Sequence, residues 1–440
     1  MTPRGTAGGL RARAAQLLHG RGWAVGPTVT GAAASGVTAA TGLVIAREIG
    51  AAAFGHFTVV LTIATILTVG MLMSLHYVMY QELPRAEPPD RPALVTTALL
   101  SALGLTAALT AAGLLAAGPL TALLGVDVRT LCFSLALAAA MTANQLTESL
   151  LRGLKRYVLT AVLKLAVAVA YLGGSSYCLL VLGIRDAEFY LVALIATNAA
   201  FAVAAVAGLE VVPRSWSPAL ARSLYRHGAY VTVLAVFTAL VFGVDVIFLN
   251  HWAGPADVGV YSVYNGFPKR LFGVLFTDGI GLVLLPTLAT MDKPALLRRI
   301  GRITPMVAAA TVLLSFAGST VFFLLLGDQY PYELDLMALS AAGMGAHMVF
   351  NLYSTALLMD GVRGAKVLIA CMVAGTPVAL ACQAALTAWH GLTGALVAFA
   401  LSNLILVALV AAAATRTYRR AVPAGADRSQ ETAPSQETAP

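Results

Sequence analysis

Charged residues are scarce in this chain of 440 residues. Asp, Glu, Lys and Arg make up 11% of it, whereas hydrophobic residues make up 59% and the mean hydropathy is +0.83. An average soluble protein is ~25% charged. The composition therefore excludes an ordinary soluble protein and predicts a polytopic membrane protein in a lipid bilayer.

Catalytic and metal-binding motifs are missing as well. The sequence has no Walker A loop, no H-E-x-x-H, no G-x-S-x-G and no Cys–His spacing typical of a metal site. Nothing therefore indicates an ATP-driven engine or a metal-dependent enzyme. The seven histidines are scattered, and the four cysteines fall in apolar segments without the spacing of a disulfide framework. We expect no cofactor, no metal and no enzymatic activity.

Long apolar stretches are what the sequence has instead. Each is about the ~20 residues that a spanning helix requires, and the longer ones are expected to tilt or kink. They predict an all-α polytopic fold of about twelve transmembrane helices. The stretches cover roughly residues 27–46, 55–80, 92–117, 129–151, 157–182, 188–212, 228–251, 257–288, 304–327, 333–359, 367–389 and 392–415.

The distribution of positive charge predicts the orientation. If the N-terminus is cytoplasmic, 22 of the 28 Lys and Arg residues fall in inside segments, and only Arg47, Arg129 and Arg185 fall in outside segments. Cytoplasmic loops are the ones that carry an excess of Lys and Arg, so this split favours twelve helices with both termini inside. The same bias accounts for the net charge of +8 without a nucleic-acid partner.

An internal repeat divides the chain. The pattern G-x-x-x-[FV]-G-x-[FY]-[TS]-V begins at Gly50 and again at Gly254, 204 positions later, and LLRGLK from Leu150 is echoed by LLMDGVR from Leu357. Because six is even, two halves of six helices enter the membrane in the same direction, as parallel repeats with a cavity between two bundles. The predicted segments are 1–26 (cytoplasmic N-terminal segment), 27–212 (first six-helix bundle), 213–227 (cytoplasmic interfacial linker), 228–415 (second six-helix bundle) and 416–440 (disordered cytoplasmic tail ending in a SQETAP repeat).

Charged residues inside the apolar stretches are the candidate functional residues. A charge at hydrocarbon depth costs ~2.5–3.5 kcal/mol on insertion scales, so it is rarely kept facing lipid. Lys269 and Arg270 lie near the expected midplane of the bilayer, and Lys164 lies closer to its cytoplasmic side. The acidic groups that could pair with them or take part in ion coupling are Asp245, Asp278 and Glu148.

Two interpretations of these charges compete. They could be ion pairs that hold the bundles together, or at least one cation could bind an anionic cargo such as a phosphate or a carboxylate. At the offset of the repeat, the positions that correspond to Lys269, Arg270, Asp245 and Asp278 are uncharged in the first half. A role in the shared fold would require equivalents in both halves, so the repeat favours a ligand role for at least one cation.

Aromatic residues accompany the charges. Tyr261, Tyr264 and Phe267 recur every third residue, with Asn265 beside them. Aromatic rings and amides are used in sugar recognition, but such a stripe in a membrane helix is also typical of packing. Tyr261, Tyr264 and Asn265 therefore join the three cations as candidate substrate contacts, and Pro268 predicts a kink at the same place.

A family resemblance rests on the order and spacing of several passages. The repeated motif, the turn LLRGLKRY, the passage DVIFLNHWAGPADVGVYSVYN and the loop LLMDGVRGAK resemble the polysaccharide and lipid-linked oligosaccharide flippases of the MOP exporter superfamily, of the Wzx type, over roughly residues 27–415. Asp245 and the run from Gly254 to Tyr264 match the family's pattern best. Lys269 and Arg270 lie where a cation that binds a diphosphate would fit.

The resemblance implies two six-helix bundles around a partly cationic cavity. It implies that alternating access moves a sugar linked to undecaprenyl diphosphate from the cytoplasmic to the outer leaflet of a bacterial inner membrane, for cell-surface polysaccharide synthesis. The partners would be the lipid-linked oligosaccharide and polysaccharide assembly proteins, the protein would be a monomer, and a coupling ion would be a proton or sodium.

Other functions stay open. An ion-coupled exporter of the related MATE group would share the architecture but would favour acidic residues in the first bundle, where only Glu148 and the helix-end Glu48 and Glu82 occur. A membrane glycosyltransferase or polymerase would need a large outside loop, whereas the longest outside loops lie around 125–129 and 327–333. A purely structural scaffold would not need charges near the midplane.

Overall fold

The computed structural model describes residues 29–31, 33–274 and 293–419. Within these ranges the chain is mostly helical and has no strand, so the predicted all-α fold is confirmed. The segment 1–26, Asp278 and the tail beyond residue 419 lie outside the described residues. The predictions made for them stay predictions.

Helices joined by short turns make up the first bundle. Met73 and Ser74, both in the left-handed conformation, interrupt the second predicted span. Asp127 caps α6 by accepting a hydrogen bond from the amide of Thr130 (3.0 Å), and the bond from the Thr130 hydroxyl keeps the pKa of Asp127 below its ordinary value. The helices of this bundle are Val29–Ile49, α2 (Ala51–Leu72), α3 (Leu75–Glu82), α4 (Arg91–Leu115), α5 (Ala117–Leu124), α6 (Val128–Gly153), α7 (Tyr157–Leu180) and α8 (Ala187–Ala207).

Longer helices make up most of the second bundle. A π-helical turn, η3, interrupts the helix that contains the predicted site. The elements are α9 (Pro218–Trp252), α10 (Pro255–Tyr261), η3 (Ser262–Gly266), α11 (Phe267–Val274), α13 (Lys293–Leu326), α14 (Leu334–Leu358) and α15 (Val362–Arg419).

The number of spans agrees with the prediction of about twelve. In the described ranges, nine helices are long and apolar enough to cross a membrane, and the pair α5 and α6, bent by 99°, makes a tenth. α15 has 58 residues, or about 87 Å at 1.5 Å per residue, which is far longer than one bilayer crossing of ~30 Å. Its backbone is non-helical at Gly391, so it provides two spans. The broken helix α10–η3–α11 belongs to the remaining predicted span.

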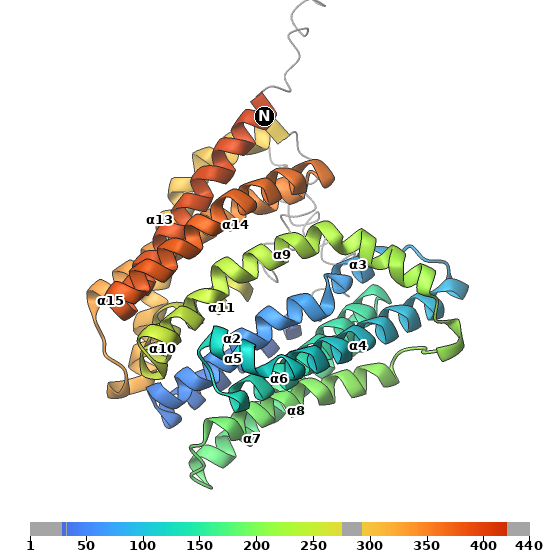
Figure 1. Cartoon of the computed structure of the whole chain (residues 1–440), viewed down its shortest axis with the longest axis horizontal. Coiled ribbons are helices and arrows are strands. Elements are labelled where there is room, and N and C mark those ends of the chain that lie inside the picture. Colours follow the sequence, from blue (N-terminus) through green and yellow to red (C-terminus); the bar gives the residue numbers. More distant parts are fainter. Residues whose placement is uncertain (1–28, 32, 275–292, 420–440) are drawn as a thin grey trace, which may run out of the picture.

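The two bundles converge at one end and diverge toward the other (Figure 1). In the first bundle, α6 packs against α2 and α8; in the second, α14 packs against α13 and α15. The convergent end lies where α10 meets α2 (Figure 1). The charge distribution predicts that this end faces outward, so the predicted orientation makes the divergent end cytoplasmic.

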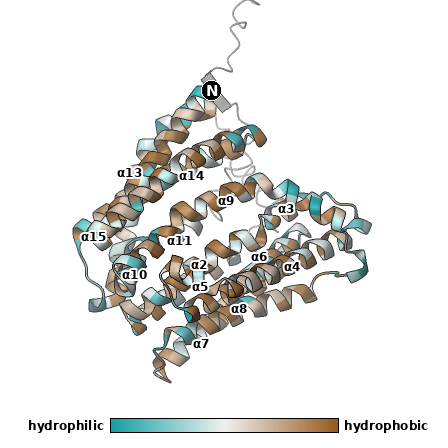
Figure 2. Cartoon of the chain, viewed as in Figure 1, coloured by the Kyte–Doolittle hydropathy of each residue, from teal (hydrophilic) through white to brown (hydrophobic). Residues whose placement is uncertain are grey.

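Apolar residues extend along the helices of both bundles, and several hydrophilic segments lie near their ends (Figure 2). Large apolar side chains are widely exposed: Leu115 is 90% exposed, Leu324 78% and Trp389 76%. In water such surfaces would be a liability. Contact with lipid removes this cost, so the exposed side chains agree with a multi-pass membrane protein.

α9 connects the two bundles. Residues 213–227 were predicted to be an interfacial linker, but those from Pro218 onward belong to α9 and continue without a break into the following span. Leu220, Leu224 and Tyr225 pack in a cluster with residues of α3 and α4, whereas Val241 packs in a cluster with α14 and α15. The same helix therefore contributes to the cores of both bundles.

Candidate functional site

The two copies of the repeated glycine motif meet at the convergent end. A Cβ added at Gly55 would lie 1.7 Å from the carbonyl oxygen of Pro255, and one added at Gly259 would lie 2.0 Å from that of Ala51. Gly259 and Pro255 are the counterparts of Gly55 and Ala51 at the offset of 204. The contact is therefore symmetrical between the halves, and both glycines are needed because the backbones approach too closely for a side chain.

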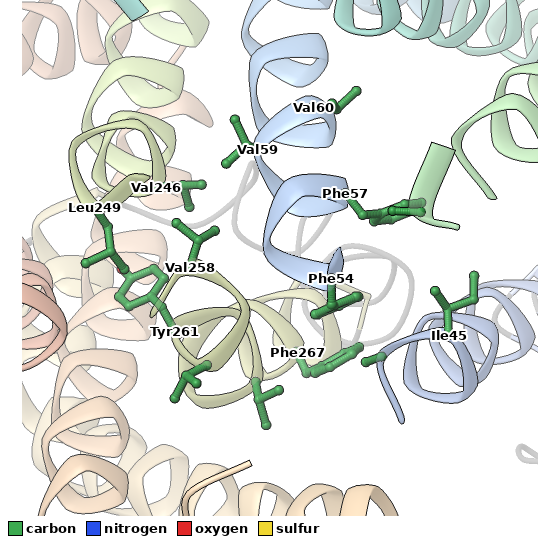
Figure 3. Close-up of a cluster of buried hydrophobic side chains, with 14 of the residues drawn as sticks. Ile45, Phe54, Phe57, Val59, Val60, Val246, Leu249, Val258, Tyr261 and Phe267 are labelled. Atoms are coloured by element: carbon green, nitrogen blue, oxygen red, sulfur yellow. The ribbon is translucent and has the colours of Figure 1, made fainter. Parts of the chain in front are cut away.

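Side chains around this contact form one apolar cluster (Figure 3). Val59 of α2, Val246 of α9 and Val258 of α10 belong to it, and the ring of Phe54 stacks on that of Phe267 with centroids 5.8 Å apart. The cluster thus draws on helices of both bundles. Its burial holds the convergent end closed in this conformation.

Hydrogen bonds also join the bundles at this end. The hydroxyl of Tyr330 donates to the backbone carbonyl of Ala46 (2.9 Å), and Arg47 donates to that of Leu325 (3.2 Å). These bonds link the helix Val29–Ile49 to the end of α13 and the turn after it. Together with the glycine contact, they close the space between the bundles on one side.

Two of the candidate residues of the second bundle form an ion pair. The ammonium of Lys269 lies 3.0 Å from Oδ2 of Asp245, which also accepts a hydrogen bond from the hydroxyl of Tyr261 (2.5 Å). Oδ1 of Asp245 accepts one from the amide of Val246 (2.9 Å). The Asp245 side chain is 1% exposed, so its charge depends on these partners. Lys269 is 19% exposed and also lies over the ring of Phe399, 4.2 Å from its centroid.

A π-helical turn, η3, ends two residues before Pro268, where a kink was predicted, and a bond from another helix compensates for the proline. Proline has no amide hydrogen, so it cannot donate to the carbonyl of Tyr264 four residues earlier. The hydroxyl of Ser340, on α14, donates to that carbonyl instead (2.6 Å). π-Helical turns are frequent at functional sites, and this one lies directly before Lys269 and Arg270.

The three predicted polar and aromatic contacts lie inside the second bundle. Tyr261, Tyr264 and Asn265 are each at most 1% exposed. The amide nitrogen of Asn265 donates to the hydroxyl of Tyr261 (2.5 Å), and the hydroxyl of Tyr264 donates to the carbonyl of Pro331 (2.6 Å). In this conformation these side chains hold the helix in place, and a sugar contact at them stays a prediction.

Arg270 differs from the other two cations. Its side chain is exposed, and no ion pair between described residues involves it. Its Nη1 atom would lie 3.9 Å from a Cβ added at Gly42 in the first bundle, and Tyr171 of α7 interacts with it electrostatically. The guanidinium therefore belongs to the second bundle but lies beside the first.

Lys164 has a carboxylate partner within the first bundle. Its ammonium lies 2.8 Å from Glu148, which also pairs with Arg152 at 2.5 Å. Lys164 and Lys269 thus have carboxylate partners, and Arg270 is the predicted cation that has none among the described residues. Asp278 lies outside the described ranges, so its predicted coupling role stays a prediction.

A pocket in the first bundle was not predicted. It has a volume of about 160 Å³ and lies between the helix Val29–Ile49, α6, α7 and α8. At its wall the amide nitrogen of Asn144 donates to Oδ1 of Asn198 (2.7 Å). Two asparagines inside apolar stretches were the available signal, because amides in membrane helices commonly bond across helices. The two residues lie 54 positions apart, so the sequence did not reveal that they form a pair.

Comparison with solved structures supports the fold. The chain is similar to a multidrug resistance MATE family transporter of the MOP superfamily in an inward-facing conformation, at 12% identity over 88% of this chain and 95% of that one, with a TM-score of 0.64. It is also similar to a multidrug resistance MATE family transporter of the MOP superfamily in an outward-facing conformation. The identity is 14% over 90% of this chain and 94% of that one, with a TM-score of 0.59. A third similar structure is a MOP superfamily transporter from Pyrococcus furiosus Vc1, which is described as having a binding pocket of reverse polarity. The identity is 13% over 89% of this chain and 94% of that one, with a TM-score of 0.60.

Sequence comparison identifies the family. No curated protein matches the chain in sequence at the level required for a significant match. One family model, described as Polysaccharide biosynthesis protein, matches residues 22–292, which is more than half of the chain. This match agrees with the resemblance carried by the repeated motif and by the passage around Asp245. The chain belongs to the polysaccharide biosynthesis protein family and has the fold of MOP superfamily transporters.

Proposed function

We propose that this protein is a flippase that moves a lipid-linked oligosaccharide, joined to its lipid by a diphosphate, from the cytoplasmic to the outer leaflet. The observation that carries the proposal is the position of Arg270, an exposed residue whose guanidinium lies beside the first bundle without a carboxylate partner among the described residues. A guanidinium binds phosphate oxygens in a two-pronged geometry and keeps its charge under all physiological conditions. A cation at this depth that has no carboxylate partner among the described residues favours an anionic cargo over a neutral or cationic one.

The arrangement of the bundles provides a route for such a cargo. With the predicted orientation, the divergent end opens toward the cytoplasm and the glycine contact between α2 and α10 closes the outside. The lipid diphosphate would enter from the inner leaflet and bind at Arg270. Closure of the cytoplasmic side and separation of Gly55 from Pro255 would then release it outward. The lipid tail would stay in the bilayer while the diphosphate and its sugar cross between the bundles.

A gradient is the expected source of energy for repeated cycles. We include proton or sodium coupling in the proposal. Its candidate groups are Asp245 and Glu148, which pair with Lys269 and Lys164, and Asp278, which follows Arg270 by eight positions in the sequence. The family supports a role in polysaccharide synthesis at a bacterial inner membrane, where assembly proteins would receive the flipped cargo. Coupling is tested by applying a pH or sodium gradient to the liposomes described next and comparing initial rates.

The experiment reconstitutes the purified protein in liposomes with a fluorescent polyprenyl-diphosphate oligosaccharide. A membrane-impermeant reagent that modifies only outer-leaflet sugar measures flipping. Because a hydrogen bond to a charged group contributes ~1.5–3 kcal/mol, Arg270→Ala should slow flipping about 10- to 100-fold, and Arg270→Lys should retain part of the rate. Arg185→Ala, at an exposed loop arginine, is the control and should flip at the wild-type rate.

The second candidate function is export of small molecules. The similarity to multidrug resistance MATE transporters favours it, and it predicts efflux of a soluble dye or drug from the same liposomes. Efflux without any protein-dependent exposure of lipid-linked sugar would replace the flippase proposal with the exporter. A wild-type flipping rate in Arg270→Ala would instead remove Arg270 from the cargo site.

A further inference from the structure

We propose that the pocket between the helix Val29–Ile49, α6, α7 and α8 binds the sugar that is attached directly to the diphosphate of the cargo. This inference rests on the proposed function, because it needs a cargo that joins a sugar to a phosphate. It places sugar recognition in the first bundle, away from Tyr261, Tyr264 and Asn265 of the second.

The size of the pocket suits one sugar ring. Its volume of about 160 Å³ equals roughly five water molecules at ~30 Å³ each, and it lies below the ~300–1,000 Å³ of sites for drug-sized ligands. A single pyranose fits such a space, whereas an oligosaccharide does not. The rest of the glycan would extend into the divergent space between the bundles.

The polar groups of the pocket leave hydrogen-bonding capacity open. Asn144 uses its amide nitrogen on Asn198, and Asn198 uses its own nitrogen on the carbonyl of Leu194 (2.8 Å). Among the bonds between described residues, none uses the side-chain oxygen of Asn144 or the hydroxyl of Ser35. Lys164 has one bond to Glu148, and an ammonium carries three hydrogens. An acceptor, a hydroxyl and a donor therefore surround a space of the right size.

Aromatic side chains complete the wall. Tyr171 and Phe201 line the pocket and are 6% and 1% exposed. The hydroxyl of Tyr171 faces the carbonyl of Tyr190 (3.4 Å), so its ring is held within the bundle. A sugar ring has an apolar face of C–H groups that packs on such side chains while its hydroxyls meet amides and alcohols. Apolar faces and scattered polar groups together match a carbohydrate.

The charges of the pocket disfavour other ligands. The lining residues include no Asp or Glu, so a cationic drug would find no counter-charge in the wall. Lys164, the lining cation, already has a carboxylate partner in Glu148, so it attracts an anion less than a lysine without a partner would. A neutral ring with many hydroxyls is the ligand class that remains.

The position of the pocket links it to the phosphate site. Tyr171 lines the pocket and also interacts electrostatically with Arg270. Thr38 lines the pocket one helical turn, about 6 Å, from Gly42, beside which the Arg270 guanidinium lies. In a glycosyl diphosphate the first phosphate is bonded to the anomeric oxygen of the first sugar. A phosphate at Arg270 therefore places that sugar next to this pocket.

The test compares binding of two probes to the full-length protein in nanodiscs. One probe is a short polyprenyl diphosphate without sugar, and the other carries one hexose or N-acetylhexosamine. Asn144→Leu should weaken binding of the sugar-bearing probe about tenfold and leave the sugar-free probe unchanged. Ser35→Ala, which removes a hydroxyl without a bond to other described residues, should weaken only the sugar-bearing probe, by a few fold. Arg270→Ala should weaken both probes.

Gln145→Leu is the matched control, because it replaces an amide on the same helix outside the pocket lining. It should bind both probes like the wild type, and thermal unfolding should show that every variant is folded. Wild-type binding of the sugar-bearing probe by both Asn144→Leu and Ser35→Ala would overturn the sugar site while Arg270 and the flippase stand. Failure of the wild type to bind either probe would overturn the proposed function together with the site.

Discussion

The two bundles share an inter-helix connection but differ in the side chains that surround it. In the first, Asn144 of α6 bonds to Asn198 of α8; in the second, Nδ1 of His347 on α14 lies 3.0 Å from Oδ1 of Asn403 on α15. The second pair lies 203 and 205 positions after the first, close to the repeat offset of 204. The same inter-helix connection thus occurs at the same place in both halves.

The surroundings of the two connections are different. Beside Asn144 there is a pocket of about 160 Å³. Beside His347 the rings of Phe242 and Phe399 lie at 4.7 and 5.9 Å between centroids, and the ammonium of Lys269 lies over Phe399. The repeat therefore preserved backbone contacts, whereas the side chains of the second half fill the space around the connection and those of the first leave room. The two halves therefore differ in the space around the same connection, which is open in the first half and filled in the second.

The largest expected effect is the loss of the buried pair in the second half. Lys269→Met should lower the free energy of unfolding by ~3–5 kcal/mol, because it leaves the Asp245 carboxylate buried without its cation. Titration with a denaturing detergent measures this change. The double variant Lys269→Met, Asp245→Asn should recover most of the loss. If the double variant is as unstable as the single one, charge pairing is not the cause.

Replacing the contact glycine should lower the stability by the same amount in either half. Gly55→Ala and Gly259→Ala each place a Cβ within 2.0 Å of a backbone oxygen. Overpacking of this kind typically costs 1–3 kcal/mol, so both variants should lose about the same stability in the same titration. Gly70→Ala, on α2 with nothing within 4 Å of the added Cβ, is the control and should be neutral. Strongly unequal losses at Gly55 and Gly259 would contradict the symmetry of the contact.

The smallest expected effect is in the ion pair of the first half. Lys164→Met should cost at most ~1 kcal/mol, because Glu148 is partly exposed and keeps its bond to Arg152. Measured beside Lys269→Met, it tests whether burial and the number of partners set the cost of losing a lysine. A loss as large as that of Lys269→Met would show that Glu148 depends on Lys164 as Asp245 depends on Lys269.

Much of the fold followed from the sequence because hydrophobicity acts locally. A run of apolar residues must form a helix in lipid whatever its neighbours are, since its backbone has no other hydrogen-bonding partners. The number of spans was therefore predictable. The continuation of the linker into α9 was not, because it depends on Leu220 and Leu224 finding α3 and α4.

The candidate site was only partly predictable. The sequence indicated that Lys164, Lys269 and Arg270 are unusual but could not distinguish them. Lys269 and Asp245 lie 24 positions apart, and Lys164 and Glu148 lie 16 apart on different helices. Whether a cation is paired depends on the packing of those helices, and this packing leaves Arg270 beside the first bundle. Asn144 and Asn198 were overlooked for the same reason.

The sequence by itself determined a multi-pass helical protein with an internal repeat and with rare charges near the midplane. Composition and the spacing of apolar stretches determine which segments of a chain cross the lipid. Only the tertiary structure decided which of those charges are paired, that the repeated glycines contact each other, and that a pocket opens in the first half. These features depend on distances between helices far apart in the chain. Such distances come from packing, which no local pattern encodes.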